Sequence, residues 1–432
     1  MIKMNQPITL SSMQFNLPKG RLTLDQIEPF IELHSNQVSG KFRNIQLNSA
    51  FQPIFSLAHR RPVGFEALLR PLASDGSPMS PLAVFDMPED ESEMVFLDRL
   101  CRIVHIRNFL AQGDENNWLF LNINPIVTVY GKRYGSFFAD VLNHYQISPH
   151  RLVIEILEGQ IQDEGLLAEA VMYFKELGCL VAIDDFGAGH SNFDRIWRIQ
   201  PHIVKLDRSI ITQAGVNPSV RRVIPNLVNL IHEAGSLALM EGVENEEEAL
   251  ISIDSDIDFV QGYYFARPER TLPAVNQHRS LIDHLSNIST LTNNNESVTY
   301  KNKLHAYQDA FQISMQQLKA GENANSACQK FLGLQGAERC YLLNSEGKQL
   351  GNNISLISSS NYDPRFEPMT DSKDAIWVRR HYFRRAINFP ESIQTSRPYL
   401  SITGGNMCVT LSVALYIDRE MIVLCGDLMW ND

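Results

Sequence analysis

The sequence predicts an α/β protein in which a TIM-type (βα)8 barrel is followed by a smaller α+β domain. Between residues 51 and 268, short segments rich in Val, Ile, Leu and Phe alternate with segments of helical length, and this alternation is typical of a parallel sheet. About eight strands in roughly 225 residues favour a closed barrel. The neighbouring strands FQPIFSL and VGFEALL predict a hairpin, so that the irregular first strand runs antiparallel.

Helical periodicity predicts the other elements in chain order. A helix-like pattern covers 23–34, and barrel helices are expected at 92–112, 163–177, 218–234 and 245–252. The Asn/Ser/Thr-rich segment 286–296 is expected to be a linker or a helix cap, with a helix following it over 299–320. We therefore expect an N-terminal extension (1–45), the barrel (46–285), a linker with a connecting helix (286–320) and a C-terminal domain (321–432).

Composition argues against several classes of function. The chain has 432 residues, of which 44% are hydrophobic, and carries a net charge of −11. Such an acidic protein is a poor general binder of a nucleic acid polymer, because attraction to phosphates needs a basic surface. The N-terminus lacks the features of a signal peptide, and no apolar run is long enough to span a bilayer. We expect a cytoplasmic protein without membrane insertion, whose six cysteines are reduced packing residues.

Six of the predicted strands end in an acid or an amide. A carboxylate at the end of a buried strand is costly to desolvate unless it meets a cation. Six such ends in series predict a ring of oxygen ligands at one rim of the barrel, where barrel enzymes keep their chemistry. The segments are GFEALLRP (64–71), LFLNINP (119–125), LVIEILE (152–158), LVAIDDFGAG (180–189), HIVKLD (202–207) and LALMEGVE (237–244).

These strand ends carry hard ligands. Carboxylates and one amide, with few His and no Cys, suit Mg²⁺ or Mn²⁺ rather than Zn²⁺. With about five carboxylates, two divalent ions fit better than one, and two ions can activate water for displacement at phosphorus. A nearby lysine can orient that water and offset phosphate charge. For Asp184 and Asp185 to serve one site, the strand has to end there, with the bend supplied by residues 186–189.

Seven motifs resemble, in order, those of EAL-domain cyclic di-GMP phosphodiesterases. They are EALLR (66–70), LNINP (121–125), EILE (155–158), DDFGAGHSN (184–192), VKLDRS (204–209), EGVEN (241–245) and QGYYFARP (261–268). The resemblance covers about residues 46–270 and is specific, because all seven occur at domain-like spacing. It implies hydrolysis of the bacterial second messenger cyclic di-GMP to linear pGpG in a TIM-type barrel. The absence of a GG(D/E)EF motif implies that the chain has no built-in cyclase.

The resemblance also implies roles for the matched residues. The first metal would be held by Glu66, Asn122, Glu155 and Asp184, and the second by Asp184, Asp185 and Glu241. Lys205 would hold the attacking water, and Glu241 is also a candidate base. Two Mg²⁺ or Mn²⁺ ions are expected per site, with Ca²⁺ binding but inhibiting.

Further residues would contact or support the substrate. The resemblance places the dinucleotide against Gln52, Leu69, Arg70, Asp207 and Gln261, and makes Glu158 and Glu244 supports of the site. The loop after Asp185 departs from the usual pattern, with Ala188, His190 and Asn192 where Thr, Tyr and Ser are common, and Asn124 replaces a common Ser. These are not ligand positions, and because this loop couples dimerisation to metal geometry in the family, the departures bear on regulation more than on chemistry.

Each site residue also has an ordinary structural interpretation. These are a helix N-cap for Asp184 and Asp185, a surface ion pair for Lys205 and Asp207, acids in a first helical turn for Glu241 and Glu244, and surface polarity for Gln261. The alternative functions are a non-catalytic cyclic di-GMP receptor and an adaptor that acts through protein contacts alone.

The C-terminal domain offers no comparable constellation. Six segments are predicted to be strands, ERCYLLN, KQLGNN, IWVRRHYFRRAI, PYLSIT, CVTLSVALYI and EMIVLCGDLMW, and some of them resemble PAS/Cache-like sensory domains. The run RRHYFRRA (379–386) fits either a solvated edge with snorkelling arginines or an anion-binding element. We expect a homodimer in which this domain receives an unknown small-molecule or protein signal and regulates the barrel.

Overall fold

The computed structural model describes residues 22–124, 127, 137–157, 164–189, 193–274, 277–356, 372–401 and 407–430. Contacts divide the chain into two units, Met1–Leu291 and Thr292–Asp432, and each is described by itself. Among the described residues, no helix is both long and apolar enough to cross a membrane. All six cysteines are buried and free of disulfides, which confirms the expectation that they serve as packing residues.

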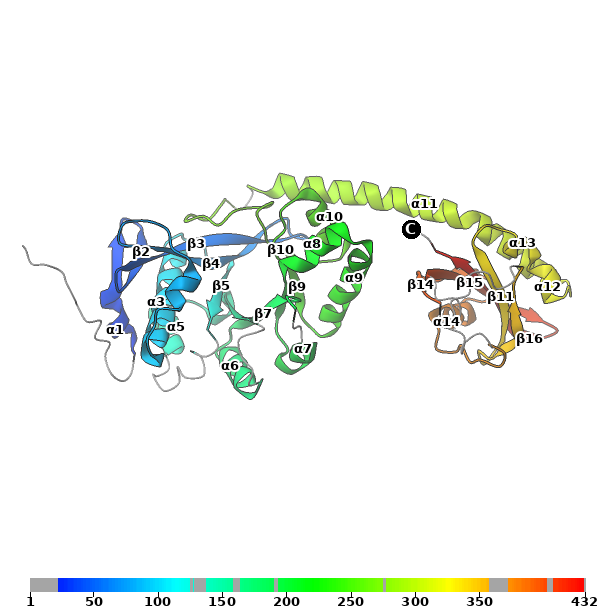
Figure 1. Ribbon diagram of the computed structural model, residues 1–432, viewed down its shortest axis with the longest axis horizontal. Coiled ribbons are helices and arrows are strands. Elements are labelled where there is room, and N and C mark those ends of the chain that lie inside the picture. The colour runs from blue at the N-terminus through cyan, green and yellow to red at the C-terminus, as the bar shows by residue number, and fades with distance from the viewer. Residues whose placement is uncertain are drawn as a thin grey trace, which may run out of the picture. The chain divides into compact units, whose positions relative to one another are not determined.

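The first unit is built around a closed barrel of eight strands (Figure 1). Neighbouring strands from β4 to β10 are parallel, whereas β3 runs antiparallel to both β4 and β10 and closes the ring. The prediction of a TIM-type barrel with an antiparallel first strand is therefore confirmed. The strands are β3 (Ile45–Ser56), β4 (Arg61–Leu72), β5 (Trp118–Ile123), β6 (Leu152–Leu157), β7 (Leu180–Phe186), β8 (Ile203–Leu206), β9 (Leu237–Met240) and β10 (Phe259–Val260).

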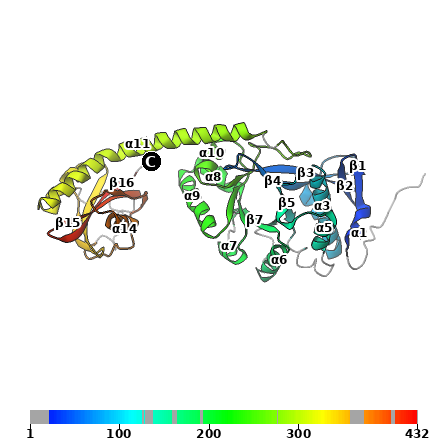
Figure 2. The ribbon, with the colours of Figure 1, turned by 180° about the vertical axis from the view of Figure 1, so that it is seen from behind.

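Helices lie on the outside of these strands (Figures 1 and 2). They are α2 (Pro81–Phe85), α3 (Glu91–Leu110), α5 (Phe137–Tyr145), α6 (Glu164–Glu176), α7 (Phe193–Ile199), α8 (Arg208–Val216), α9 (Pro218–Glu233) and α10 (Glu246–Asp254). Several begin at a side chain that accepts a hydrogen bond from the first turn, as Asp90 does for α3 and Asn245 for α10. Such caps satisfy backbone N–H groups that have no partner within the helix.

The helix expected at 23–34 is wrong over most of its length. Only α1 (Leu24–Ile27) is helical; a short 3-10 turn (Glu28–Phe30) follows, and then β1 (Ile31–His34) pairs antiparallel with β2 (Gln37–Phe42). Pro29 lies in the 3-10 turn, at its N-terminal end. A proline lacks the N–H that a longer helix needs at this point, so the apolar residues beyond it pair as a strand instead.

An apolar layer fills the barrel below the site. Its side chains come from seven of the eight strands and form one cluster, Ile54, Phe120, Val153, Ala182, Ile203, Leu239 and Phe259. The eighth strand, β4, contributes Gly64, where an added Cβ would lie 2.6 Å from Phe120 Cε2. The ring of Phe120 thus occupies the space that a side chain at Gly64 would need.

The second unit contains a six-stranded sheet in the order β12-β11-β16-β15-β13, with β14 paired to β15. One face packs against α11, α12 and α13 through a cluster that includes Phe311 and Phe331, and the other packs against α14 through Tyr382 and Phe383. The elements are α11 (Arg279–Lys319), whose residues up to Leu291 belong to the first unit, α12 (Ala324–Ala327), α13 (Gln329–Leu332), β11 (Ala337–Asn344), β12 (Gln349–Ile354), α14 (His381–Asn388), β13 (Gln394–Thr395), β14 (Tyr399–Leu400), β15 (Met407–Ile417) and β16 (Glu420–Met429).

Two expectations for this part of the chain are wrong. The segment 286–296 contains the boundary between the two units, as a linker would, but it is not irregular, because its backbone lies within helix α11. The run RRHYFRRA is not a strand, because α14 begins at His381 after Arg380. Its buried residues Tyr382, Phe383 and Ala386 follow the spacing of one helical face, which the strand interpretation overlooked.

We predict that Gly64→Ala destabilises the barrel, because the new Cβ cannot fit beside Phe120 without displacing it. Overpacking of this kind costs about 1–3 kcal/mol. Gly215→Ala is the matched control, since Gly215 lies in α8 with no atom within 4 Å of the added Cβ. Thermal unfolding should show a lower midpoint for Gly64→Ala alone; equal midpoints for both variants would contradict the packing described here.

Candidate active site

A polar layer lies directly above the apolar layer. Two residues along a strand, the side chain returns to the same face. On the parallel strands the residues two positions after the apolar layer are Glu66, Asn122, Glu155, Asp184, Lys205, Glu241 and Gln261, and the antiparallel β3 supplies Gln52, two positions before Ile54. The predicted ring of polar strand ends is thus brought together at one end of the barrel.

Lys205 lies at the centre of this ring. Its side chain is 1% exposed, and its Nζ lies 2.5 Å from Glu155 Oε1, 2.7 Å from Glu241 Oε1 and 2.9 Å from Asp184 Oδ1. A fourth carboxylate oxygen, Glu66 Oε2, lies 3.9 Å away. One ammonium group therefore faces four carboxylates, which leaves an excess of negative charge. This rules out the interpretation of Lys205 as half of a surface ion pair.

Glu66 is held by amide groups from both sides. Asn122 donates to Glu66 Oε1 over 2.9 Å, and Gln261 donates to Glu66 Oε2 over 2.6 Å and to Gln52 Oε1 over 3.2 Å. Gln52 in turn donates to the carbonyl of Ala266. Since Gln261 is 3% exposed, it is a buried part of the site rather than a polar surface residue.

Asp184 and Asp185 reach the same site through an irregularity in β7. The register between β7 and β8 shifts between Ile183 and Phe186, and Asp185 has a φ of 57°. A left-handed backbone is uncommon for residues other than Gly, although Asp tolerates it better than most. The sequence predicted that the strand ends at Asp185 and that residues 186–189 supply the bend. Instead, β7 continues to Phe186, and the irregular backbone conformation that brings both carboxylates together is at Asp185 itself.

Burial and mutual repulsion change the acidity of the carboxyl groups. Burial raises the pKa of Glu241 to about 8, although Lys205 opposes the shift, and burial with the charge of Asp184 raises the pKa of Asp185 to about 6. Burial also raises the pKa of Glu155 well above its usual range. For Lys205, burial alone would lower the pKa, but the surrounding carboxylates outweigh it and raise the pKa well above its usual value.

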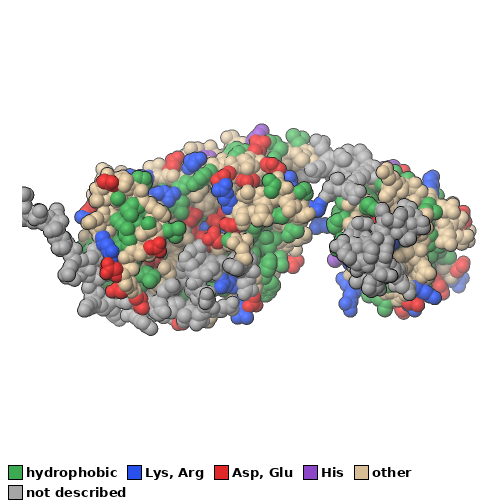
Figure 3. Space-filling model, viewed as in Figure 1, with side chains coloured by type: hydrophobic (Ala, Val, Ile, Leu, Met, Phe, Trp, Pro, Cys, Tyr) green, Lys and Arg blue, Asp and Glu red, His purple; other side chains and the backbone are tan. Residues whose placement is uncertain are grey.

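The residues fit a divalent cation. Asp184, Asp185 and Glu241 each offer an oxygen, and these atoms lie within 4.8 Å of one another. Although Lys205 is close, neither buried oxygen of Glu155 accepts a well-directed hydrogen bond from the described residues. Acidic side chains gather in a hollow of this unit (Figure 3), and the oxygen-only donor set is the one that Mg²⁺ and Mn²⁺ prefer.

A cavity of about 320 Å³ opens above these carboxylates. Of the predicted substrate contacts, Gln52 and Gln261 line it, and Leu69, Arg70 and Asp207 do not. Asp207 caps helix α8 by accepting a hydrogen bond from Ser209 N–H over 3.0 Å. Arg70 donates to the carbonyl of Leu69 over 2.9 Å.

The position of Leu69 argues against the predicted substrate contact. Leu69 is 6% exposed and belongs to the main core cluster, together with Phe65 and Ala67 of the same strand. These residues lie on the face of β4 opposite to Glu66, because side chains alternate along a strand. Leu68, two positions after Glu66, shares its face instead.

Four residues that line the cavity were not predicted, Arg208, Gly242, Gly262 and Tyr263. Arg208 pairs with Glu244 over 2.7 Å, and an added Cβ at Gly242 would lie 2.5 Å from Arg208 Cγ. All four occur inside the recognised motifs, each next to another cavity residue or a predicted site residue, and this adjacency was the signal in the sequence that could have identified them. Glu158, predicted to support the site, lies outside the described residues, as do His190 and Asn192.

The chain is similar to several known proteins. It is 27% identical over 225 residues to the signaling protein YkoW of Bacillus subtilis, which covers 50% of this chain and 28% of YkoW. It is 25% identical over 226 residues to the probable cyclic di-GMP phosphodiesterase PdeB of Escherichia coli, which covers 50% of this chain and 42% of PdeB. The matches thus span less than half of the length of these two relatives.

A solved structure resembles the fold over most of its length. The crystal structure of the Bacillus subtilis YkuI protein, with an EAL domain, in complex with substrate c-di-GMP and calcium, superimposes with a TM-score of 0.74 at 23% identity, covering 89% of this chain and 97% of that one. The profile of the EAL domain matches residues 35–268, which is more than half of the 432 residues. The chain therefore belongs to the EAL domain family.

Proposed function

We propose that this protein is a phosphodiesterase that hydrolyses one phosphodiester bond of cyclic di-GMP to give linear pGpG. The observation that carries this proposal is the buried Lys205 surrounded by four carboxylates at the carboxyl ends of the barrel strands. The similarity to PdeB, a probable cyclic di-GMP phosphodiesterase, and the cyclic di-GMP in the YkuI crystal support the choice of substrate.

The site would hold two divalent ions, Mg²⁺ or Mn²⁺. The proposed ligands of the first are Glu66, Asn122, Glu155 and Asp184, and those of the second are Asp184, Asp185 and Glu241. When bound, such ions lower the pKa of water and stabilise charge that develops on the phosphate. Ca²⁺ tolerates looser coordination with more ligands, so it would bind and inhibit.

The remaining roles belong to the chain itself. Lys205 orients the attacking water and offsets phosphate charge. Glu241, whose pKa burial raises to about 8, suits a group that accepts a proton near neutral pH. Gln52, Arg70, Asp207 and Gln261 are proposed to contact or position the dinucleotide, with Leu68 replacing Leu69, while Glu158 and Glu244 support the site.

The rival function is a receptor that binds cyclic di-GMP without cleaving it. A degenerate site would be expected to have lost ligands at the strand ends, and this chain keeps an acid or amide at every matched position. A third possibility, an adaptor that acts through protein contacts, requires no nucleotide binding. Calorimetry with cyclic di-GMP separates the adaptor from the other two, and chromatography of the nucleotide separates the enzyme from the receptor.

We predict that the purified protein linearises cyclic di-GMP with Mg²⁺ or Mn²⁺, and that Glu66→Ala lowers turnover by about 100-fold or more, because it removes a group that organises transition-state charge. Glu176→Gln is the control, since Glu176 ends α6 and is exposed. The product is measured by chromatography. Tight binding by the wild type without cleavage under either metal would favour the receptor.

We predict that Mg²⁺ binds more tightly as pH rises from about 6 to about 8, because the ion displaces protons from Asp185 and Glu241. Calorimetry in buffers of different ionisation enthalpy measures the proton release. In Glu241→Gln one of the protonated ligands is gone, so fewer protons should be released for each ion bound. An affinity that stays constant across this interval would disprove the proposed coupling of acids and metal.

We further propose that the C-terminal domain is a PAS/Cache-like sensor that regulates the barrel within a homodimer. The proposed domain limits are 1–45 for the N-terminal extension, 46–285 for the barrel, 286–320 for the connecting segment and 321–432 for this C-terminal domain. Its antiparallel sheet, covered on both faces by helices, supports a compact module that can receive a signal. Coupling requires that the signal favour one arrangement of the dimer over another.

We predict that truncation to residues 1–298 changes both the turnover of cyclic di-GMP and the oligomeric state. The cut removes the sheet of the second unit and retains all of the first. Steady-state rates and light scattering measure the two properties. Unchanged rates and an unchanged mass would leave the C-terminal domain without a regulatory role and would indicate a docking module.

A further inference from the structure

The C-terminal sheet carries charged residues on a face that is largely apolar elsewhere. On the side that packs against α14, β16 presents Val423 and Cys425 and then Asp427, and β11 presents Leu343 and Tyr341 and then Arg339. Arg339 is 9% and Asp427 5% exposed. Burying charge on a sheet face is costly. The buried charges at this end of the sheet therefore make it a candidate for a binding site.

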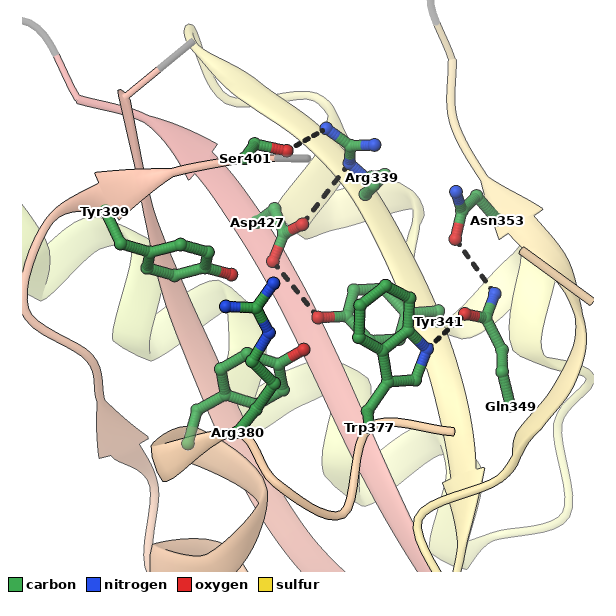
Figure 4. A pocket seen from close by; sticks show the side chains of 10 residues that line it. Arg339, Tyr341, Gln349, Asn353, Trp377, Arg380, Tyr399, Ser401 and Asp427 are labelled. Carbon is green, nitrogen blue, oxygen red and sulfur yellow. Dashed lines mark hydrogen bonds and ion pairs between the residues drawn. The ribbon is translucent and has the colours of Figure 1, made fainter. Parts of the chain in front are cut away.

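Arg339 and Asp427 pair with each other and with polar groups from several strands, and Arg339 also pairs with Glu338 over 2.8 Å. Arg339 Nε lies 3.3 Å from Asp427 Oδ2, and Arg339 also donates to Ser401 Oγ over 3.1 Å. Thr410 donates to Asp427 Oδ1 over 2.8 Å, and Tyr341 donates to the same oxygen over 3.4 Å. Figure 4 shows Arg339, Tyr341, Ser401 and Asp427 on the strands beneath a pocket that they line. Since Asp427 is paired within the domain, the floor does not require a cationic ligand.

Aromatic rings and a further arginine form the wall of the pocket. The guanidinium carbon of Arg380 lies 5.9 Å from the ring centre of Trp377 and 5.6 Å from that of Tyr399. Figure 4 shows Arg380 between these two side chains. Tyr382 stacks on Tyr399 with 6.2 Å between ring centres. Among the described residues, the Arg380 side chain has no hydrogen-bond or carboxylate partner. Its positive charge is therefore available to a ligand.

A second cavity, of about 420 Å³, adjoins this pocket and shares Arg380, Tyr382 and Tyr399 with it. Arg385 and Arg397 add two more guanidinium groups, and none of the described residues that line this cavity is Asp or Glu. A volume of this size is typical of small-molecule sites. The cavity combines positive charge with flat apolar walls in a chain whose net charge is −11.

We propose that this second cavity, called the groove from here on, binds a small organic anion. The carboxylate or phosphate oxygens of the ligand pair with Arg380, and its body lies against Tyr382 and Tyr399. A guanidinium group binds such planar oxyanions through two parallel hydrogen bonds. Arg385 and Arg397 extend the positive surface along the groove and favour a ligand with more than one anionic oxygen. All residues of this site belong to the second unit, so the proposed binding does not require the reaction proposed for the barrel.

The test is calorimetry on the full chain with three probes: citrate, guanosine 5′-monophosphate and inorganic phosphate. Arg380→Gln removes the proposed contact, and Arg379→Gln is the matched control, because Arg379 is exposed and lines neither cavity. Losing a charge-assisted pair should weaken binding roughly 10- to 100-fold. Arg397→Gln provides a second, exposed position should Arg380→Gln fail to fold.

Saturable binding of citrate or guanosine 5′-monophosphate that is weakened in Arg380→Gln and unchanged in Arg379→Gln supports the proposal, and the stronger of the two probes identifies carboxylate or phosphate as the preferred group. Binding of inorganic phosphate alone would contradict the role given to the aromatic wall. An absence of saturable binding by all three, or an equal loss in both variants, would overturn the site.

Discussion

The negative charge that converges on Lys205 is the constraint on which the barrel site depends. Four carboxylates lie within 3.9 Å of one buried ammonium group, so the site keeps an excess of negative charge after Lys205 has been counted. Buried charge without compensation is costly. The folded chain can lower that cost by keeping Glu155 and Glu241 protonated, as their raised pKa values indicate, or by binding cations. Acidity and metal affinity are therefore two consequences of one arrangement.

That arrangement requires all eight strands to be in register. Each polar side chain stands two residues from a member of the apolar layer, and a slip of one residue in any strand would turn its side chain to the opposite face. Even β3, which runs antiparallel, brings Gln52 to the same level as Gln261, with 3.2 Å between their amide groups. The close packing of the strands also restricts the residue at position 64 to glycine, because the ring of Phe120 fills the space that a side chain there would need.

The barrel and the polar ring were predictable because both follow from local patterns that tertiary contacts do not override. Buried parallel strands are continuous apolar runs, and an acid at the end of such a run stands out. Leu69 was assigned to the substrate because a sequence motif does not state which face of the strand each residue occupies. The alternation of side chains along β4, counted from Glu66, places Leu69 on the opposite face. The segment 286–296 was misassigned because its Asn, Ser and Thr composition resembles a loop, although its backbone is part of α11. Arg208 lies directly after Asp207 in a recognised motif, but the sequence does not state that its side chain turns toward the cavity.

The run RRHYFRRA shows how a change of secondary structure changes the chemistry. As a strand, its side chains would alternate between two faces. As a helix from His381, it places His381 and Arg385 one turn apart, and both line the groove, whereas Tyr382, Phe383 and Ala386 are buried. The helix thus secures itself to the sheet with apolar residues and leaves arginines beside the aromatic wall. In the barrel, carboxylates outnumber their cation, which favours bound metal ions. Among the residues that line the groove and the adjoining pocket, arginines outnumber carboxylates, which favours an anion.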